Sequence, residues 1–355
     1  MRKRFLLLLT GALMLAGSAF AKPGIPVVMY PSKAEQVKML NEADDLIDDM
    51  ADGLQDRQAD AIYHAMRGVG GELAQVRASR NAVSAAAKGV ERRDITGEGS
   101  VKRLKMRLYR PSKPSSSPLP ILVYFHGGGW TFGSIDSCAA FCDQLAATGN
   151  VMVLAVDYSL APENPFSDGL TDCEESIRYA MAHAKEWGSS PELVSAGGDS
   201  AGGNLALASA IDLAKTKRLS APLRSLVLIY PVVKAYKDGS ASWKQYSRGY
   251  GLDGRLMEAF NEAYLSDGKT DAKNPLVSPA HAADTELKTL PPVLMLSAER
   301  DILFDQGKEF AARLKKLGKS VDRIEFPGAI HTFVTVKGQP TAFQKAVDIT
   351  GAFLK

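Results

Sequence analysis

Cysteine is scarce in this chain of 355 residues, which contains only Cys138, Cys142 and Cys173. No two of them form a Cys-x-x-Cys pair, so the sequence indicates neither a zinc framework nor a thioredoxin-type redox site. Cys138 and Cys142 are four residues apart in a predicted helix, a spacing that rarely gives disulfide geometry. Either could instead pair with Cys173, and three buried free thiols are equally compatible with the sequence.

The chain also lacks an excess of charge outside its first residues. The formal net charge is +3, and all of that excess lies in Arg2, Lys3 and Arg4. Without residues 1–21, the chain has as many basic as acidic residues, which does not indicate nucleic acid or an anionic lipid as partner. His-Glu-x-x-His and Walker A motifs are absent, so neither a zinc protease nor an NTPase is indicated. We expect no metal and no cofactor.

Long apolar runs are missing except at the start, where Phe5–Phe20 follows the three basic residues. The segment ends in Ala19-Phe20-Ala21, which fits the small-x-small rule of a cleavage site. We therefore expect residues 1–21 to be a signal peptide and the protein to be exported, either to the periplasm or out of the cell. An uncleaved membrane anchor is the alternative, but the run is near the short end for a span. No cysteine follows it, so a lipid anchor is not indicated.

Proline is absent from residue 32 to residue 88, and the pattern there is helical. One helical face is predicted by apolar residues spaced three or four apart: Val37, Leu40, Ala43, Ile47, Met50 and Leu54. Acidic residues on the opposite face are expected to be solvated. A further helix is predicted over residues 72–88, so residues 22–89 form an N-terminal helical region.

From residue 90 to residue 355 the pattern becomes α/β. Short apolar runs predict about eight strands, over 90–95, 104–109, 121–125, 151–156, 193–196, 226–229, 293–297 and 321–326. Helical patterns separate most of them, which predicts a mostly parallel sheet with helices on both faces. Residues 232–290 are too long for a plain crossover, so we expect an insertion there.

The nucleophile is predicted at Ser200, in Gly198-Asp199-Ser200-Ala201-Gly202 between a strand and a helix. Gly-x-Ser-x-Gly in this context is the signature of a nucleophile elbow, whose sharp turn requires glycine two residues on either side of the serine. Asp199 is expected to hydrogen-bond nearby loop amides.

A serine nucleophile needs a base, and the base needs a residue that orients it. His331 and Asp301 follow predicted strands, so both are expected at the edge where Ser200 lies. His331 is the predicted base, and Asp301 is predicted to hold it in the correct tautomer. Glu299 and Asp305 are alternatives to Asp301.

Another candidate acid, Asp157, precedes Ser200 and is disfavoured by chain order. The strand over 121–125 leads directly into His126-Gly127-Gly128-Gly129-Trp130. Amides in a glycine run can approach an oxyanion closely, so Gly127, Gly128 and Ala201 are predicted to form an oxyanion hole. His126 is expected to brace this loop.

Together these motifs resemble those of the bacterial hormone-sensitive-lipase family of esterases. The segment Asp157-Tyr158-Ser159-Leu160-Ala161-Pro162-Glu163 is similar to a further block of that family, with Ser159 where arginine is usual. The resemblance implies an α/β-hydrolase fold and hydrolysis of short- to medium-chain acyl esters without a cofactor. It also implies that residues 22–89 and 232–290 together form a helical cap. The aromatic residues Trp130, Phe132, Tyr158 and Phe166 are candidates for the pocket walls.

Two other functions use the same residues. A peptidase or a deacetylase of polysaccharides or small molecules would keep Ser200, Asp301 and His331 and change only the substrate. A non-catalytic ligand-binding protein on the same fold is a third interpretation, since fold alone does not determine function. Monomer and homodimer both remain open.

Overall fold

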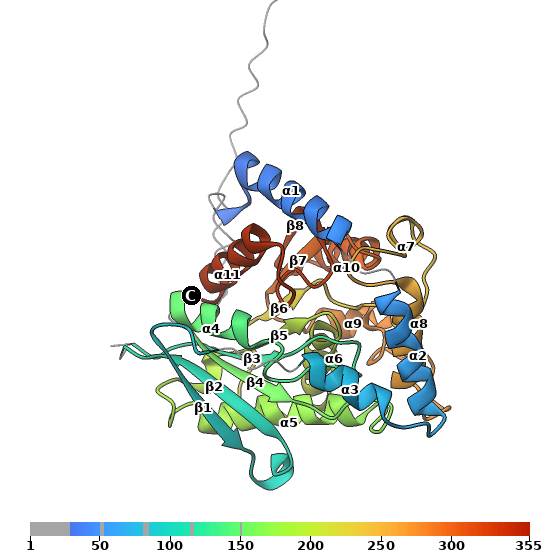
Figure 1. Ribbon diagram of the computed structural model, residues 1–355. Coiled ribbons are helices and arrows are strands. Elements are labelled where there is room, and N and C mark those ends of the chain that lie inside the picture. The colour runs from blue at the N-terminus through green and yellow to red at the C-terminus, as the bar shows by residue number, and fades with distance from the viewer. Residues whose placement is uncertain (1–28, 50–52, 81–84, 114–116, 150) are drawn as a thin grey trace, which may run out of the picture.

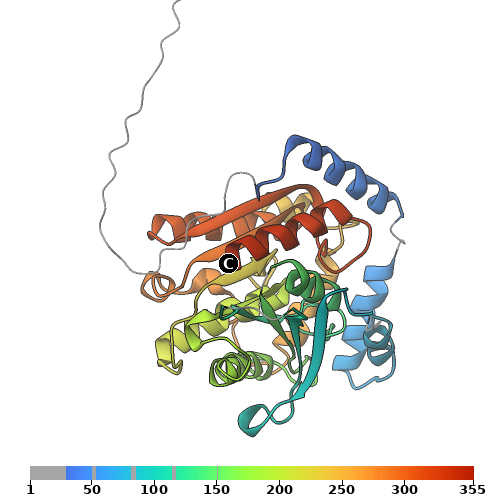
Figure 2. The same cartoon turned by 90° about the vertical axis from the view of Figure 1, so that its left-hand side faces the viewer.

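The computed structural model describes residues 29–49, 53–80, 85–113, 117–149 and 151–355 (Figures 1 and 2). The predicted signal peptide, residues 1–21, lies outside the described residues. Within those residues, no helix combines the length and apolar character that crossing a membrane requires.

The centre of the molecule is an eight-stranded sheet in the order β1-β2-β4-β3-β5-β6-β7-β8. Its first two pairings, β1 with β2 and β2 with β4, are antiparallel, and all the others are parallel. This confirms the predicted α/β-hydrolase sheet of about eight mostly parallel strands. The strands are β1 (Val90–Thr96), β2 (Lys105–Pro111), β3 (Ile121–Phe125), β4 (Met152–Asp157), β5 (Val194–Asp199), β6 (Leu226–Ile229), β7 (Val293–Arg300) and β8 (Val321–Ile330).

The central strands are apolar because helices cover both faces of the sheet. Every residue of β3 is buried, and Phe125 at its end pairs in register with Gly198 of β5. Asp199 pairs with Ile229, the last residue of β6. The carboxyl ends of these parallel strands therefore meet at one edge, where ligands of such sheets bind.

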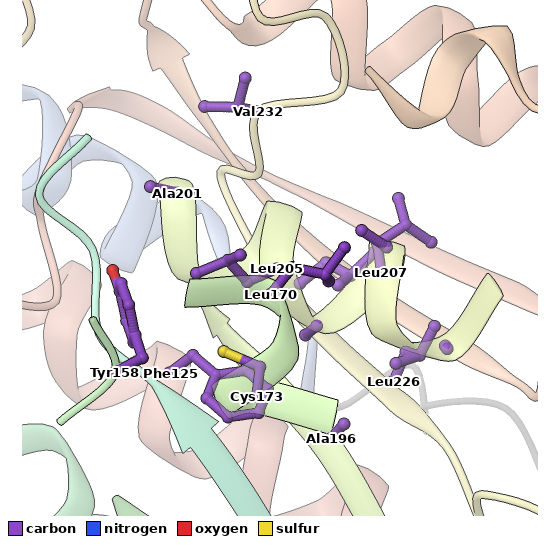
Figure 3. Packing of buried hydrophobic residues seen from close by; sticks show 14 of the residues in the cluster. Phe125, Tyr158, Leu170, Cys173, Ala196, Ala201, Leu205, Leu207, Leu226 and Val232 are labelled. Carbon is purple, nitrogen blue, oxygen red and sulfur yellow. The ribbon is translucent and has the colours of Figure 1, made fainter. Parts of the chain in front are cut away.

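Five long helices cover the two faces of the sheet. On one face lie α5 (Asp168–His183), α6 (Ala201–Thr216) and α10 (Phe304–Lys316), which share an apolar cluster with β3 residues Ile121, Val123 and Phe125. Figure 3 shows part of this cluster, with Phe125 near Cys173 of α5 and Leu205 of α6. On the other face lie α4 (Ala139–Gly149) and α11 (Pro340–Leu354), whose cluster includes Leu122 and Tyr124. Alternate residues of one strand thus pack into different layers.

The two layers also separate the cysteines. Cys173 belongs to the cluster of α5, whereas Cys138 and Cys142 belong to the cluster of α4. All three are buried and free, so the sheet prevents the disulfide considered between Cys173 and either of the others.

The N-terminal region forms α1 (Lys33–Asp49), α2 (Leu54–Met66) and α3 (Glu72–Arg80). The single helical face predicted through Leu54 is wrong, because the chain turns at Gly53 with a φ of 74° before α2 begins. Val37 and Leu54 are 57% and 44% exposed, whereas Met39 and Ala43 are fully buried. The buried face of α1 is determined by its packing on β8 and α11, which periodicity alone does not show.

The acidic residues of α1 and α2 are not simply solvated. Glu42 accepts hydrogen bonds from the backbone nitrogen and the hydroxyl of Thr341 at 3.0 and 2.6 Å. Asp44 pairs with Arg300, and Asp56 lies 3.2 Å from Arg255. These contacts attach the N-terminal helices to the sheet domain and to the segment between β6 and β7.

That segment contains α7 (Ala241–Gln245), α8 (Gly254–Tyr264) and α9 (Asp284–Leu287). Helix α8 packs along α2, and the two helices lie side by side at the carboxyl edge of the sheet (Figure 1). The structure thus places parts of both predicted cap segments next to each other. Three short 3₁₀ helices complete the described elements: η2 (Gly99–Val101), η3 (Pro191–Leu193) and η4 (Pro279–His281).

Candidate active site

Ser200 lies on a sharp turn between β5 and α6. Its backbone has φ 55° and ψ −117°, a conformation that non-glycine residues rarely adopt. A Cβ atom at Gly202 would lie 1.9 Å from the Phe125 carbonyl oxygen, so this neighbour must be glycine. The turn directs the serine away from the helix and into a pocket, in the conformation predicted for a nucleophile elbow.

A chain of hydrogen bonds connects Ser200 to two other buried residues. His331 Nε2 lies 3.0 Å from the Ser200 hydroxyl, and His331 Nδ1 lies 2.6 Å from Asp301 Oδ2. The other carboxylate oxygen of Asp301 accepts the amide of Leu303 at 2.9 Å. Asp301 therefore holds the imidazole so that Nε2 is free to accept the serine proton.

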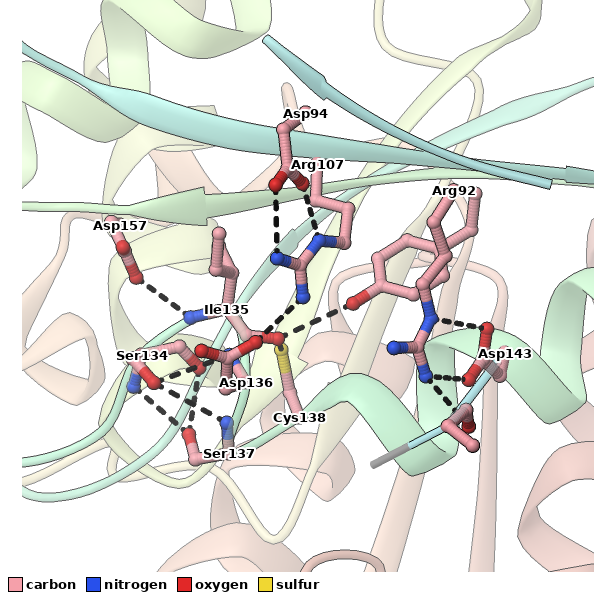
Figure 4. A network of polar contacts seen from close by, with 12 residues as sticks. Arg92, Asp94, Arg107, Ser134, Ile135, Asp136, Ser137, Cys138, Asp143 and Asp157 are labelled. Atoms are coloured by element: carbon pink, nitrogen blue, oxygen red, sulfur yellow. Dashed lines mark hydrogen bonds and ion pairs between the residues drawn. The ribbon is translucent and has the colours of Figure 1, made fainter. Parts of the chain in front are cut away.

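The alternative acids have other partners. Glu299 accepts the amide of Gly328 at 2.6 Å, and Asp305 accepts that of Ser242 at 2.8 Å. Asp157 accepts the amide of Ile135 at 2.7 Å in a polar network that also contains Arg107 and Asp136 (Figure 4). These three carboxylates stabilise loops, and the structure brings only Asp301 to His331.

The glycine run after β3 differs from expectation in one residue. The amide of Gly127 donates to Asp199 Oδ1 at 3.0 Å, so this amide is already engaged. The amides of Gly128 and Gly129 have no acceptor in the part of the chain that the structure describes, and both residues line the pocket. The geometry therefore favours Gly129 over the predicted Gly127 as the second amide of this loop that is available to an oxyanion. Which glycine amides of the run are free depends on where the Asp199 carboxylate lies. The sequence pattern alone does not show that position.

Asp199 and His126 both hydrogen-bond to this loop, at Gly127. The Tyr124 hydroxyl also donates to Asp199 Oδ1, at 2.8 Å, and burial raises the pKa of this carboxyl. Burial lowers the pKa of His126, and its Nδ1 donates to the Gly127 carbonyl at 2.8 Å. The ring of His126 stacks on Tyr158, with 4.4 Å between ring centroids. Both side chains brace the loop, as the sequence predicted.

Ala201, the third predicted donor, is the first residue of α6 and is buried directly after Ser200. Within the described residues its amide has no acceptor. The partial positive charge of a helix N-terminus favours an anion at this position.

The pocket at Ser200 has a volume of about 500 Å³. Its walls are mostly apolar and come from three parts of the chain. The residues that line it outside the catalytic loops include Leu46, Leu54, Gln55, Leu252, Leu256, Phe260, Ile330 and Val336. None of the four aromatic residues predicted as pocket walls lines it, because Trp130, Phe132 and Tyr158 belong to the core and Phe166 packs against that core. Among the described residues, no group of His, Cys, Asp and Glu side chains has the arrangement to hold a metal ion.

Substitution of Gly128 by alanine is expected to lower kcat by roughly 10²–10³-fold, the usual cost of losing one oxyanion donor. Gly128 has a φ of 117°, and a Cβ atom there would lie 2.4 Å from the Phe132 carbonyl oxygen. The loop must therefore shift and move the amide. Gly188→Ala is the matched control, because Gly188 has a φ of 80° but open space around a Cβ. Steady-state hydrolysis by both variants tests this expectation, and equal kcat values would contradict it.

Residues 122–335 match the sequence profile of a family described as alpha/beta hydrolase fold. An arylesterase of Saccharolobus solfataricus is 35% identical over 267 residues, which are 75% of this chain and 83% of that protein. The carboxylic ester hydrolase LipN of Mycobacterium tuberculosis is 34% identical over 246 residues, 68% of this chain and 64% of LipN.

Solved structures show the same likeness. An esterase of Pyrobaculum calidifontis superposes with a TM-score of 0.68 at 33% sequence identity, covering 80% of this chain and 88% of that one. The residues that match the family profile, 122–335, include Ser200, Asp301 and His331.

Proposed function

The chain belongs to the α/β-hydrolase family, and from this premise we propose that it is a serine esterase that hydrolyses short- to medium-chain acyl esters. An enzyme of the esterase type is what its named relatives indicate. The observation that carries the proposal is the hydrogen-bonded chain from Ser200 through His331 to Asp301, which opens onto an apolar pocket.

In the proposed reaction, the Ser200 hydroxyl attacks the ester carbonyl carbon while His331 Nε2 takes its proton. The negative charge that develops on the carbonyl oxygen is stabilised by the amides of Gly128, Gly129 and Ala201. His331 then gives the proton to the departing alcohol, which leaves an acyl group on Ser200. A water molecule, deprotonated by His331, attacks the acyl carbon, the bond to Ser200 breaks, and His331 returns the proton to the serine oxygen as the acid is released. Asp301 stabilises the imidazolium in both halves of the reaction.

The volume and the apolar lining of the pocket support the proposal of a small substrate. Its volume of about 500 Å³ lies within the range of roughly 300–1,000 Å³ typical of small-molecule sites. The mostly apolar side chains that line it suit an acyl chain, whereas a peptide or polysaccharide would need more polar partners. A protein that only binds ligands has no need of the buried Ser200–His331–Asp301 chain.

The proposal is tested with the purified protein and p-nitrophenyl esters from acetate to palmitate. We expect the highest kcat/KM at short to medium chains, and the rate to depend on Ser200. Hydrolysis no faster than in the absence of protein would refute the esterase proposal and favour the ligand-binding interpretation. An optimum at palmitate would refute only the chain-length proposal. Faster release of acetate from an acetylated polysaccharide than from any simple ester would favour the deacetylase.

Export is proposed on the sequence pattern of residues 1–21 alone. It is supported by the basic start, the apolar run and Ala19-Phe20-Ala21. Mass spectrometry of the protein from its native cells should find a chain that starts at Lys22, and a chain that retains Phe5–Phe20 would contradict cleavage.

A further inference from the structure

Arg77 of α3 is hydrogen-bonded to two loops at the active site. Its Nε donates to the Thr131 carbonyl at 2.8 Å, and its Nη2 donates to the Ala161 carbonyl at 2.8 Å. Nη1 and Nη2 also donate to the two carboxylate oxygens of Glu163, each at 2.8 Å. One guanidinium thus joins the N-terminal helices to the loop after β3 and to the loop after β4.

The carbonyl that Arg77 holds belongs to the turn that carries the oxyanion donors. The amides of Thr131 and Phe132 donate to the Gly128 carbonyl at 3.1 and 2.8 Å, and the Thr131 hydroxyl donates to the Gly129 carbonyl at 3.0 Å. Trp130, inside this turn, has a φ of 58°, which is an unfavourable conformation for a tryptophan. Such a turn keeps its shape only where its surroundings determine it.

The two loops are also hydrogen-bonded directly to each other, which closes a ring of contacts with Arg77. The Ala161 amide donates to the Trp130 carbonyl at 2.8 Å, while the Ala161 carbonyl accepts from Arg77. The two loops are therefore tied directly through Ala161 and indirectly through Arg77. An arginine suits this place because its planar group presents several donors in fixed directions, which lysine does not.

We propose that Arg77 is a positioning residue for the oxyanion hole: from outside the sheet domain it fixes the turn that aims the amides of Gly128 and Gly129. This inference rests on the proposed ester hydrolysis and assigns to α3 a role in the chemical step rather than in covering the pocket. Arg77 does not line the pocket, so we expect its effect to be on the rate of reaction and not on binding.

The test compares Arg77→Ala with Arg313→Ala. Arg313 of α10 makes the same kind of contacts, to the carbonyls of Ala280 and Ala282 at 2.7 Å and to the Asp284 carboxylate at 2.6 Å, but holds a loop that does not line the pocket. We expect Arg77→Ala to lower kcat for p-nitrophenyl butyrate by roughly 10–100-fold with little change in KM, because small misplacement of a catalytic group has effects of this size. Arg313→Ala should retain the kcat of the unmodified protein.

Three readouts separate positioning from a loss of structure. Added guanidinium chloride, at concentrations too low to denature, should raise the rate of Arg77→Ala and not that of Arg313→Ala. Arg77→Lys should retain most of the loss in kcat, because one ammonium group cannot replace the several fixed donors of the planar guanidinium. Thermal melting of each variant reports on stability separately. If Arg77→Ala is insoluble, Arg77→Lys carries the test.

The outcomes are distinct. An unmodified protein without esterase activity would refute the proposed function. An active protein in which Arg77→Ala equals Arg313→Ala in kcat, or in which Arg77→Lys has full kcat, would overturn only the role of Arg77. A rise in KM at constant kcat would also overturn it, because that result indicates substrate binding.

Discussion

Ser200→Ala should lose ester hydrolysis by on the order of 10⁶-fold in kcat, because no other group at the site can form the acyl-enzyme. His331 would lose the hydroxyl that lies 3.0 Å from its Nε2 and would have no nucleophile to activate. The fold should be retained, since alanine removes one oxygen and leaves the backbone of the turn as it is. Kinetics with p-nitrophenyl butyrate, together with the melting temperature, tests both parts of this expectation.

Ser195→Ala provides the matched control. Ser195 lies on β5, the strand that leads to Ser200, and is also buried, but its hydroxyl bonds to that of Ser225 at 2.8 Å and does not line the pocket. This variant should be less stable and nearly as active as the unmodified protein. If the two variants lost activity to the same extent, the nucleophile would have to be another residue.

Asp301→Asn should lower kcat by about 10⁴-fold, the effect expected when the base is held in the wrong tautomer. The asparagine amide would donate to His331 Nδ1 instead of accepting from it. The proton of the imidazole would then lie on Nε2, which faces Ser200 and must be free to take a proton. The position of the ring should change little, because the side chains have the same shape.

Glu299→Gln and Asp305→Asn are the controls for this substitution. Each amide keeps an oxygen that can accept the backbone hydrogen bond from Gly328 or Ser242. Both variants should retain kcat within a few-fold, as expected for acids that are not bonded to the catalytic histidine. A loss of about 10⁴-fold in either one would assign the orienting role to that residue.

Much of the sheet was predictable from the sequence because its strands are uniformly apolar. The predicted bounds of β3 and β6 agree with the structure, since both strands are buried on two sides and end at turns. Ser200, Asp301 and His331 were predictable for a related reason. Each follows a parallel strand, and parallel strands bring their carboxyl ends to one edge whatever the loops between them.

Other features depend on contacts that a linear pattern does not contain. The choice between Gly127 and Gly129 as a donor is decided by Asp199, whose carboxylate engages the amide of Gly127. Phe260 forms part of the pocket because α8 packs along α2, although the two helices are far apart in sequence. The end of α1 was missed because the apolar spacing continues to Leu54 across Gly53, where the backbone turns.

The docking of α1 on the last strand and helix has a consequence for the order in which the protein folds. Glu42 binds Thr341, 299 positions along the chain, and Asp44 pairs with Arg300. During synthesis from the N-terminus, α1 has no such partners until almost the whole chain has emerged from the ribosome. Contacts between such distant residues also form slowly, because a long loop must close first. Leu46 of α1 lines the pocket, so the finished binding site should be one of the last parts of the nascent protein to appear.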